Sequence, residues 1–160
     1  MGKKDELIQR YSGYVKLAAM DKPFISRAEE RRLLEDGVSK FELGADDARG
    51  VLLAVAQAND IRVERDIDRR MIPILERFGG RRRRIGRTRF EEAAAIYNGL
   101  AGGTLTEDET RIRVKRIMEG NGFRARRKGL LMSRRWYRRI GRKNRQGGLA
   151  SDMPQGQGRA

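Results

Sequence analysis

Basic side chains in the second half of this sequence have the type and the spacing that bind phosphate groups. All but two of fourteen candidates are arginine. The planar guanidinium group of arginine donates paired hydrogen bonds to phosphate oxygens, whereas the ammonium group of lysine acts as a point charge. The predicted contact residues are Arg81, Arg82, Arg83, Arg84, Arg87, Arg126, Arg127, Lys128, Arg134, Arg135, Arg138, Arg139, Arg142 and Lys143.

The net charge of the chain lies entirely in its second part. Residues 1–75 carry 14 basic and 14 acidic side chains, whereas residues 76–160 carry 23 and 8, which accounts for the whole formal charge of +15. Residues 77–90 alone hold seven arginines and no acidic side chain. A neutral part joined to a strongly cationic part indicates a scaffold that presents a surface to a polyanion.

Catalytic and metal-binding chemistry has few candidate residues in this chain. There is no cysteine and no histidine, which removes the usual thiol nucleophile, the commonest general base and two metal ligands. The acidic clusters at 29–30, 91–92 and 107–109 fall in the first turns of predicted helices, where carboxylates interact favourably with the helix dipole. Gly102-Gly103 is not followed by the Lys-Ser/Thr of a phosphate-binding loop. We therefore expect a protein that is not an enzyme and that has no cofactor and no metal.

The elements that position the basic residues are predicted to be helices. Apolar residues recur every three or four positions up to about residue 140, and no alternating stretch predicts a sheet. A capping box, in which Ser or Thr is followed three residues later by Glu, marks three of the helix starts. Residues 81–87 are predicted to be a mobile loop. Helices are expected at 5–19, from Ser26, after Gly44, from Arg62 to Gly79, from Thr88, from Thr106 and at 124–142.

The predicted fold is all-α, a bundle of about seven helices in a single domain over residues 1–143. Its charge-neutral half covers 1–75 and its basic half 76–143. Residues 144–160 are rich in Gly, Gln and Ser and are predicted to form a disordered tail. The expected core residues are Leu34, Val38, Val51, Leu52, Ile74, Phe78, Phe90, Tyr97, Val114, Ile117, Met118 and Phe123.

An internal repeat is suggested by the same pattern. Shifting the chain by 80 residues places the capping box at Ser26 on the one at Thr106, and the apolar positions that follow also coincide. The exposed charges are inverted, because Asp47 then falls on Arg127. Two unrelated helical hairpins would share these features, so both interpretations stay open.

The last predicted helix, at 124–142, has one apolar half and one arginine half. Met132, Trp136 and Ile140 fall on one side, and the arginines of residues 134–142 fall on the other. Trp136 is expected to pack in the core. The alternative for Trp136 is stacking on the bases of a single strand.

A short pattern surrounds the predicted turn before Thr106. It consists of Ala101, Gly103, Leu105, Thr106 and Glu109. This pattern resembles the helix–loop–helix of TerB-like domains, the tellurite-resistance family and its relatives fused to J-domain co-chaperones. The resemblance implies an all-helical bundle over residues 5–140. Where the family carries a loop Asp that is implicated in metal binding, this chain has Gly102, so the resemblance supports the fold and not a metal site.

Three kinds of partner are considered for the basic surface. The preferred one is nucleic acid, RNA or DNA, contacted through phosphates, because the uniform arginines lack the mixed polar set that reads base edges. The alternative is that the chain is a basic adaptor or structural subunit docking on an acidic protein in a larger assembly. We do not expect a membrane partner, because the bundle needs the apolar half of the last helix for its own core. No apolar run approaches the ~20 residues of a membrane span, and no apolar signal core follows Met1, so we expect a cytoplasmic protein.

Overall fold

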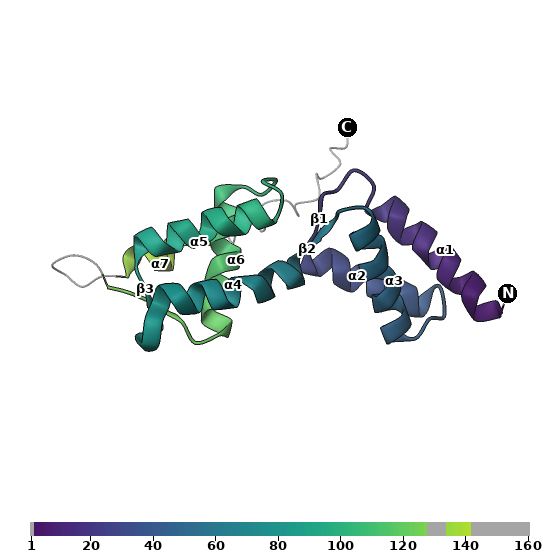
Figure 1. Cartoon of the computed structure of the whole chain (residues 1–160), viewed down its shortest axis with the longest axis horizontal. Helices are drawn as coiled ribbons and strands as arrows, with labels where there is room; N and C mark the ends of the chain where they lie inside the picture. Colours follow the sequence, from purple (N-terminus) through teal and green to yellow (C-terminus); the bar gives the residue numbers. More distant parts are fainter. Residues whose placement is uncertain (1, 128–133, 142–160) are drawn as a thin grey trace, which may run out of the picture. The chain divides into compact units, whose positions relative to one another are not determined.

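The computed structural model of this chain describes residues 2–127 and 134–141. In these residues, seven α-helices, one 3-10 turn and four two-residue strands follow one another along the chain (Figure 1). They are α1 Lys3–Ala18, β1 Phe24–Ile25, α2 Arg27–Ser39, α3 Ala45–Ala58, β2 Arg62–Val63, α4 Glu64–Gly79, η1 Gly80–Arg82, β3 Arg84–Ile85, α5 Arg87–Leu100, α6 Glu107–Gly120, β4 Arg124–Ala125 and α7 Arg135–Arg139. The all-α class and the number of helices are confirmed. The predicted tail at 144–160 lies outside the described residues.

Within residues 2–127 and 134–141, no helix combines the length and the apolarity needed to cross a membrane.

Contacts between residues divide the predicted domain at 1–143 into two compact units. The first unit comprises Met1–Pro73 and Ile96–Leu105, and the second comprises Ile74–Ala95 and the described residues from Thr106 onward. The division at Pro73 falls inside α4 and close to residue 75, where the sequence changes from charge-neutral to basic. The arginine-rich segments at 81–87 and from residue 124 onward therefore belong to the same unit.

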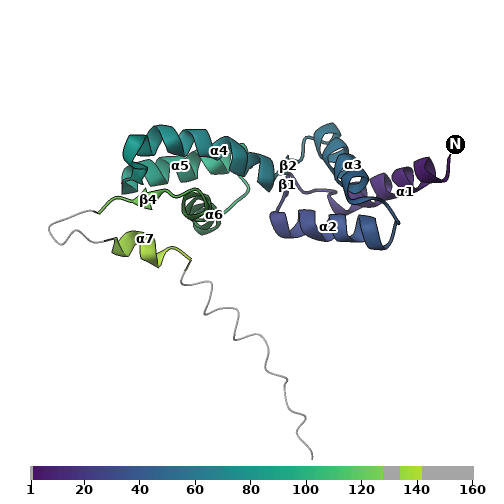
Figure 2. The same cartoon turned by 90° about the horizontal axis from the view of Figure 1, so that it is seen from below.

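The core of the first unit lies where α3 packs against both α1 and α2 (Figure 2). Its buried residues are Tyr11, Val15, Leu33, Leu43, Ala48, Leu52 and Val55. The hydroxyl of Tyr11 donates a hydrogen bond to the carbonyl oxygen of Leu33 over 2.8 Å. Burial raises the pKa of Tyr11 to about 12, so this hydroxyl stays protonated and continues to donate.

Helix α2 turns a different face to this core than the apolar pattern predicts. Val38 is 46% exposed, so its prediction as a core residue is wrong. The neighbouring Gly37 is buried instead, and a Cβ atom at this position would lie only 2.9 Å from the Cβ of Ala48 and 2.9 Å from the Cζ of Tyr11. A search for apolar side chains at helical spacing does not count glycine as a core residue. At Gly37, however, the absence of a side chain is what lets α2 pack closely against α1 and α3.

The other predicted core residues are buried to different degrees. Buried residues are Leu52, Phe90, Tyr97, Val114, Ile117, Met118 and Phe123, and half-buried residues are Leu34, Val51, Ile74 and Phe78.

Two short parallel ladders join segments that the sequence pattern treats as connections between helices. β1 pairs with β2, and β3 pairs with β4. Strands of two residues are too short to show an alternating pattern, so the sequence does not predict them. The prediction of a mobile loop at 81–87 is wrong, because this segment contains part of η1 and β3, and Ile85 is fully buried.

The ladders reveal an internal repeat in a register different from the predicted one. Elements α1, β1, α2, α3 and β2 form the first repeat, and they recur in the same order as α4, β3, α5, α6 and β4, the second repeat. The offset is 60 residues between β1 and β3 and 62 between β2 and β4. The predicted offset of 80 is wrong, because it superposes Ser26, at the start of the second helix of the repeat, on Thr106, at the start of the third.

Hydrogen bonds after the third helix of each repeat support this equivalence. Asn59 and Asn121 are the C-caps of α3 and α6, and each donates from Nδ2 to the carbonyl oxygen four residues earlier over 2.7 Å. Three residues further on, the backbone N–H groups of Arg62 and Arg124 each donate across their ladder over 2.8 Å. The two turns are thus built by the same residue type with the same bonds.

Two of the three predicted capping boxes are present. The hydroxyls of Ser26 and Thr106 accept from the backbone N–H of the glutamate three residues later over 3.2 and 3.3 Å, and these glutamates accept from the two cap N–H groups in return. The box at Thr88 is wrong, because α5 begins at Arg87 and Thr88 already lies inside the helix. The β3 strand determines this earlier start.

The predicted last helix at 124–142 is wrong in its first part. Residues 124–125 form β4, and among the described residues only Arg135–Arg139 are helical in this region. Residues 128–133 and 142 lie outside the described residues. Pairing of β4 with β3 takes the segment after α6 out of a helical path, so Arg126 and Arg127 do not share a helix face with the arginines of α7.

Candidate functional site

The β3–β4 ladder brings together two basic segments that are far apart in the sequence. Arg84 lies opposite Arg124 in the ladder. The backbone N–H of Arg124 donates to the carbonyl of Arg83 over 2.8 Å, and that of Arg126 donates to the carbonyl of Ile85 over 2.7 Å. Because these bonds hold the segment after α4 against the segment after α6, the arginines of both segments gather in one part of the second unit.

Seven arginines line an open groove of about 860 Å³ in the second unit, which we term the arginine groove. One part of its lining runs from the last turn of α4 through η1 to β3, and the other consists of residues 125–127 and of Arg134, the residue before α7. Phe78, Gly79, Gly80 and Ala125 complete the surface. The arginines are Arg77, Arg81, Arg82, Arg84, Arg126, Arg127 and Arg134.

The guanidinium groups of the arginine groove have no acidic partner within the described residues. No carboxylate of the described residues lines the groove, and arginines outside its lining, such as Arg83, Arg89 and Arg111, form ion pairs in the second unit. Like charges gathered around one hollow repel one another, and an anion in the hollow would relieve this repulsion. The Nε atom of Arg134 is also buried without a hydrogen-bond partner among the described residues.

The structure brings together six of the fourteen predicted contact residues. These six are Arg81, Arg82, Arg84, Arg126, Arg127 and Arg134. Four others are exposed or partly exposed outside the groove lining, namely Arg87, Arg135, Arg138 and Arg139. Lys128, Arg142 and Lys143 lie outside the described residues.

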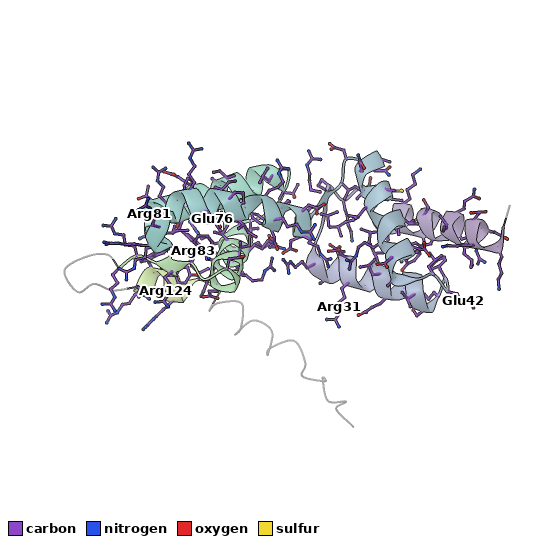
Figure 3. The ribbon with its side chains drawn as sticks, turned by 60° about the horizontal axis from the view of Figure 1, so that its bottom comes forward. Arg31, Glu42, Glu76, Arg81, Arg83 and Arg124 are labelled. Atoms are coloured by element: carbon purple, nitrogen blue, oxygen red, sulfur yellow. The ribbon has the colours of Figure 1, made fainter. Side chains whose placement is uncertain are left out.

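Arg83 has a different role from its neighbours in the arginine run. Its guanidinium forms an ion pair with Glu76 at 3.2 Å and donates to the carbonyl oxygen of Asn121 over 2.8 Å (Figure 3). It also lies 5.1 Å from the centre of the Phe123 ring. Arg83 has a left-handed backbone with φ of 47°. These contacts tie the turn after α4 to the turn after α6, so Arg83 stabilises the groove without lining it.

Arg77 lines the groove but was missed as a contact residue in the sequence. It lies in the last turn of α4, four residues before Arg81. The signal that could have found it is this spacing, because a residue in the last turn of a helix lies near the chain that leaves the helix.

The first repeat shows that the scaffold does not require these arginines. Arg77, Arg81, Arg82, Arg84, Arg126 and Arg127 correspond to Leu17, Asp21, Lys22, Phe24, Glu64 and Arg65. At the position that corresponds to Arg126, directly after the β2 strand of the first repeat, the chain carries Glu64, which is buried and accepts from the backbone N–H of Arg27 over 2.8 Å. The same arrangement of elements thus forms with mixed side chains. The uniform arginines of the second repeat therefore need a reason other than folding.

An aromatic cluster holds α7 in the second unit and so positions Arg134. The Trp136 ring lies edge-on to Phe90 of α5 and to Tyr137, with ring centres 5.4 and 5.5 Å apart. The ammonium group of Lys115 donates to the carbonyl oxygen of Ile140 over 3.1 Å and lies 5.2 Å from the centre of the Tyr137 ring. Trp136 therefore packs against the core of the unit, as predicted.

Comparisons with family models, with curated proteins and with solved structures found no match to this chain. The resemblance to TerB-like domains stays a prediction. Among residues 2–127 and 134–141, no group of three acidic side chains is arranged to hold a metal ion.

Proposed function

We propose that this protein is a non-enzymatic, sequence-nonspecific nucleic-acid-binding protein whose arginine groove holds the phosphate backbone. The observation that carries the proposal is the gathering of seven arginines around one hollow, with no acidic partner among the described residues. The groups come from two segments that are joined by a ladder, so their arrangement is set by the fold.

A polymer of phosphates fits this groove better than a single small anion. One inorganic phosphate would meet two or three guanidinium groups and leave the rest uncompensated. A nucleic-acid backbone presents phosphates in series, and each one that is neutralised by an arginine releases condensed counterions, which favours binding. The exposed arginines outside the groove add to the positive field that attracts the polymer.

The composition of the groove supports contact with phosphates and not with base edges. Reading a sequence requires different donors and acceptors at different positions, such as Asn or Gln for adenine and acidic groups for cytosine. The groove offers guanidinium donors beside glycines, one phenylalanine and one alanine. Affinity should therefore change little between unrelated sequences of equal length.

Two matched double variants test whether the groove is the contact surface. Arg81→Gln with Arg82→Gln removes two charges from the groove, and Arg138→Gln with Arg139→Gln removes two from α7, outside the groove lining. All four side chains are exposed, so we expect both variants to fold normally. Fluorescence anisotropy with a labelled duplex should show a loss of about tenfold or more for the groove variant and a much smaller loss for the α7 variant.

Equal losses in the two variants would contradict the groove as the contact surface. Absence of binding to any nucleic acid at low salt would contradict the proposed function itself. Purification from the native host with and without nuclease then tests the alternative partner, an acidic protein. An acidic protein that stays bound in stoichiometric amount after nuclease treatment would support the adaptor alternative.

A further inference from the structure

The aromatic side chains of this protein bear on which form of nucleic acid the arginine groove binds. All ten aromatic residues lie within the described residues, and none of them is exposed. The exposed large apolar side chains in the described residues are the aliphatic ones of Leu17, Met20, Val38, Leu53 and Ile96. The chain therefore presents no exposed aromatic ring as a platform on which a base could stack.

Phe78 in the groove lining and Trp136, two residues after Arg134, already contact other side chains. Phe78 lines the groove but is half-buried, and the guanidinium of Arg89 lies 5.1 Å from the centre of its ring. Trp136 is held edge-on between Phe90 and Tyr137. Proteins that bind single strands without sequence preference combine a basic groove with aromatic platforms, and stacking on these platforms contributes much of their affinity. This groove has the first component without the second.

A duplex needs no such platform. It keeps its bases stacked inside and turns its phosphates outward, with one charge per roughly 1.7 Å of helix axis. Guanidinium groups on the two segments of the groove lining, such as Arg81 on one and Arg126 on the other, can contact phosphates on both sides of a backbone that enters it. Resting on the proposed function, we propose that the arginine groove binds the phosphodiester backbone of double-stranded nucleic acid in preference to single strands.

Competition between a duplex and its own component strands tests this preference. A labelled mixed-sequence DNA duplex is bound to the full chain, and unlabelled duplex or either strand is added at equal phosphate concentration. We expect the duplex to compete about tenfold more effectively than either strand. An RNA duplex and its strands form a second arm, which shows whether the groove distinguishes the two backbones. A strand that competes as well as or better than the duplex would overturn the preference, whereas no binding in any arm would overturn the proposed function as well.

Trp136 supplies a second readout, because it is the only tryptophan in the chain. If the bases do not stack on it, saturation with duplex or strand should leave its fluorescence nearly unchanged. The variant Trp136→Phe, which keeps an aromatic ring beside Phe90, should retain the preference for duplex. Strong quenching by single strands, or loss of the preference in Trp136→Phe, would show that Trp136 contacts bases and would contradict the inference.

Discussion

Gly37 of α2 faces Tyr11 of α1 and Ala48 of α3, and its replacement by alanine tests the packing of the first unit. An added Cβ would lie 2.9 Å from the Cβ of Ala48 and 2.9 Å from the Cζ of Tyr11, which is closer than Cβ atoms approach other heavy atoms. Overpacking of this kind costs roughly 1–3 kcal/mol, whereas alanine gains about 1 kcal/mol over glycine in a helix interior. Both neighbours are fully buried and cannot move aside, so the overpacking cost should fall in the upper part of its range, about 2–3 kcal/mol. After the gain in helix propensity, we expect Gly37→Ala to destabilise the protein by about 1–2 kcal/mol.

Gly50 provides a matched control for this prediction. It also lies inside a helix of the same unit, in α3, but an added Cβ would meet nothing within 4 Å. Gly50→Ala should therefore stabilise the protein by about 0.5–1 kcal/mol. Thermal unfolding followed by circular dichroism should place the two variants on opposite sides of the wild type. A Gly37→Ala variant that melts at or above the wild-type temperature would refute this account of the helix packing.

Further predictions compare the stability effects of replacing a true helix cap or core residue with those of replacing a residue that only has the same sequence pattern. Thr106→Ala should cost about 1 kcal/mol and Thr88→Ala much less, which denaturant unfolding would measure; equal losses would contradict the assigned start of α5. Hydrogen bonds from the Thr106 backbone N–H and hydroxyl hold the pKa of Glu109 below its ordinary value, so the cap should stabilise α6 above that ordinary pKa and lose its effect as the pH falls through the lowered one. The difference between wild type and Thr106→Ala, measured at neutral and at acidic pH, should shrink on acidification. Met118→Ala should lower the free energy of unfolding by about 2–4 kcal/mol because the side chain is fully buried. Val38→Ala should change it by less than about 0.5 kcal/mol because Val38 is exposed. Comparable losses in the two variants would contradict the exposed position of Val38 on α2.

Local signals in the sequence predict the helices of this protein well. A capping box depends on residues within one turn, and the boxes at Ser26 and Thr106 are present where the pattern places them. The box at Thr88 fails because a distant segment decides the outcome. Pairing of β3 with β4 positions Ile85 and Gly86, and the helix then begins at Arg87.

The charges of the candidate site can be predicted from the sequence, but their assembly cannot. Composition identifies Arg81–Arg84 and the arginines after residue 124 as a cationic surface. Their meeting in one groove depends on a ladder of two residues per strand, which leaves no pattern. The separate role of Arg83 depends on its left-handed backbone and on its contact with Glu76. A run of identical residues gives no sign of which one forms an ion pair with the preceding helix.

The salt dependence of binding is the most direct test of the claim that the arginine groove holds a nucleic-acid backbone. For duplex DNA, the logarithm of the binding constant should fall linearly with the logarithm of salt concentration, with a slope near −0.9 for each phosphate contacted. If each of the seven groove arginines contacts one phosphate, the slope should be roughly −6, and Arg81→Gln with Arg82→Gln should make it shallower by about 1.8. An unchanged slope in this variant, or a wild-type slope near zero, would contradict the account.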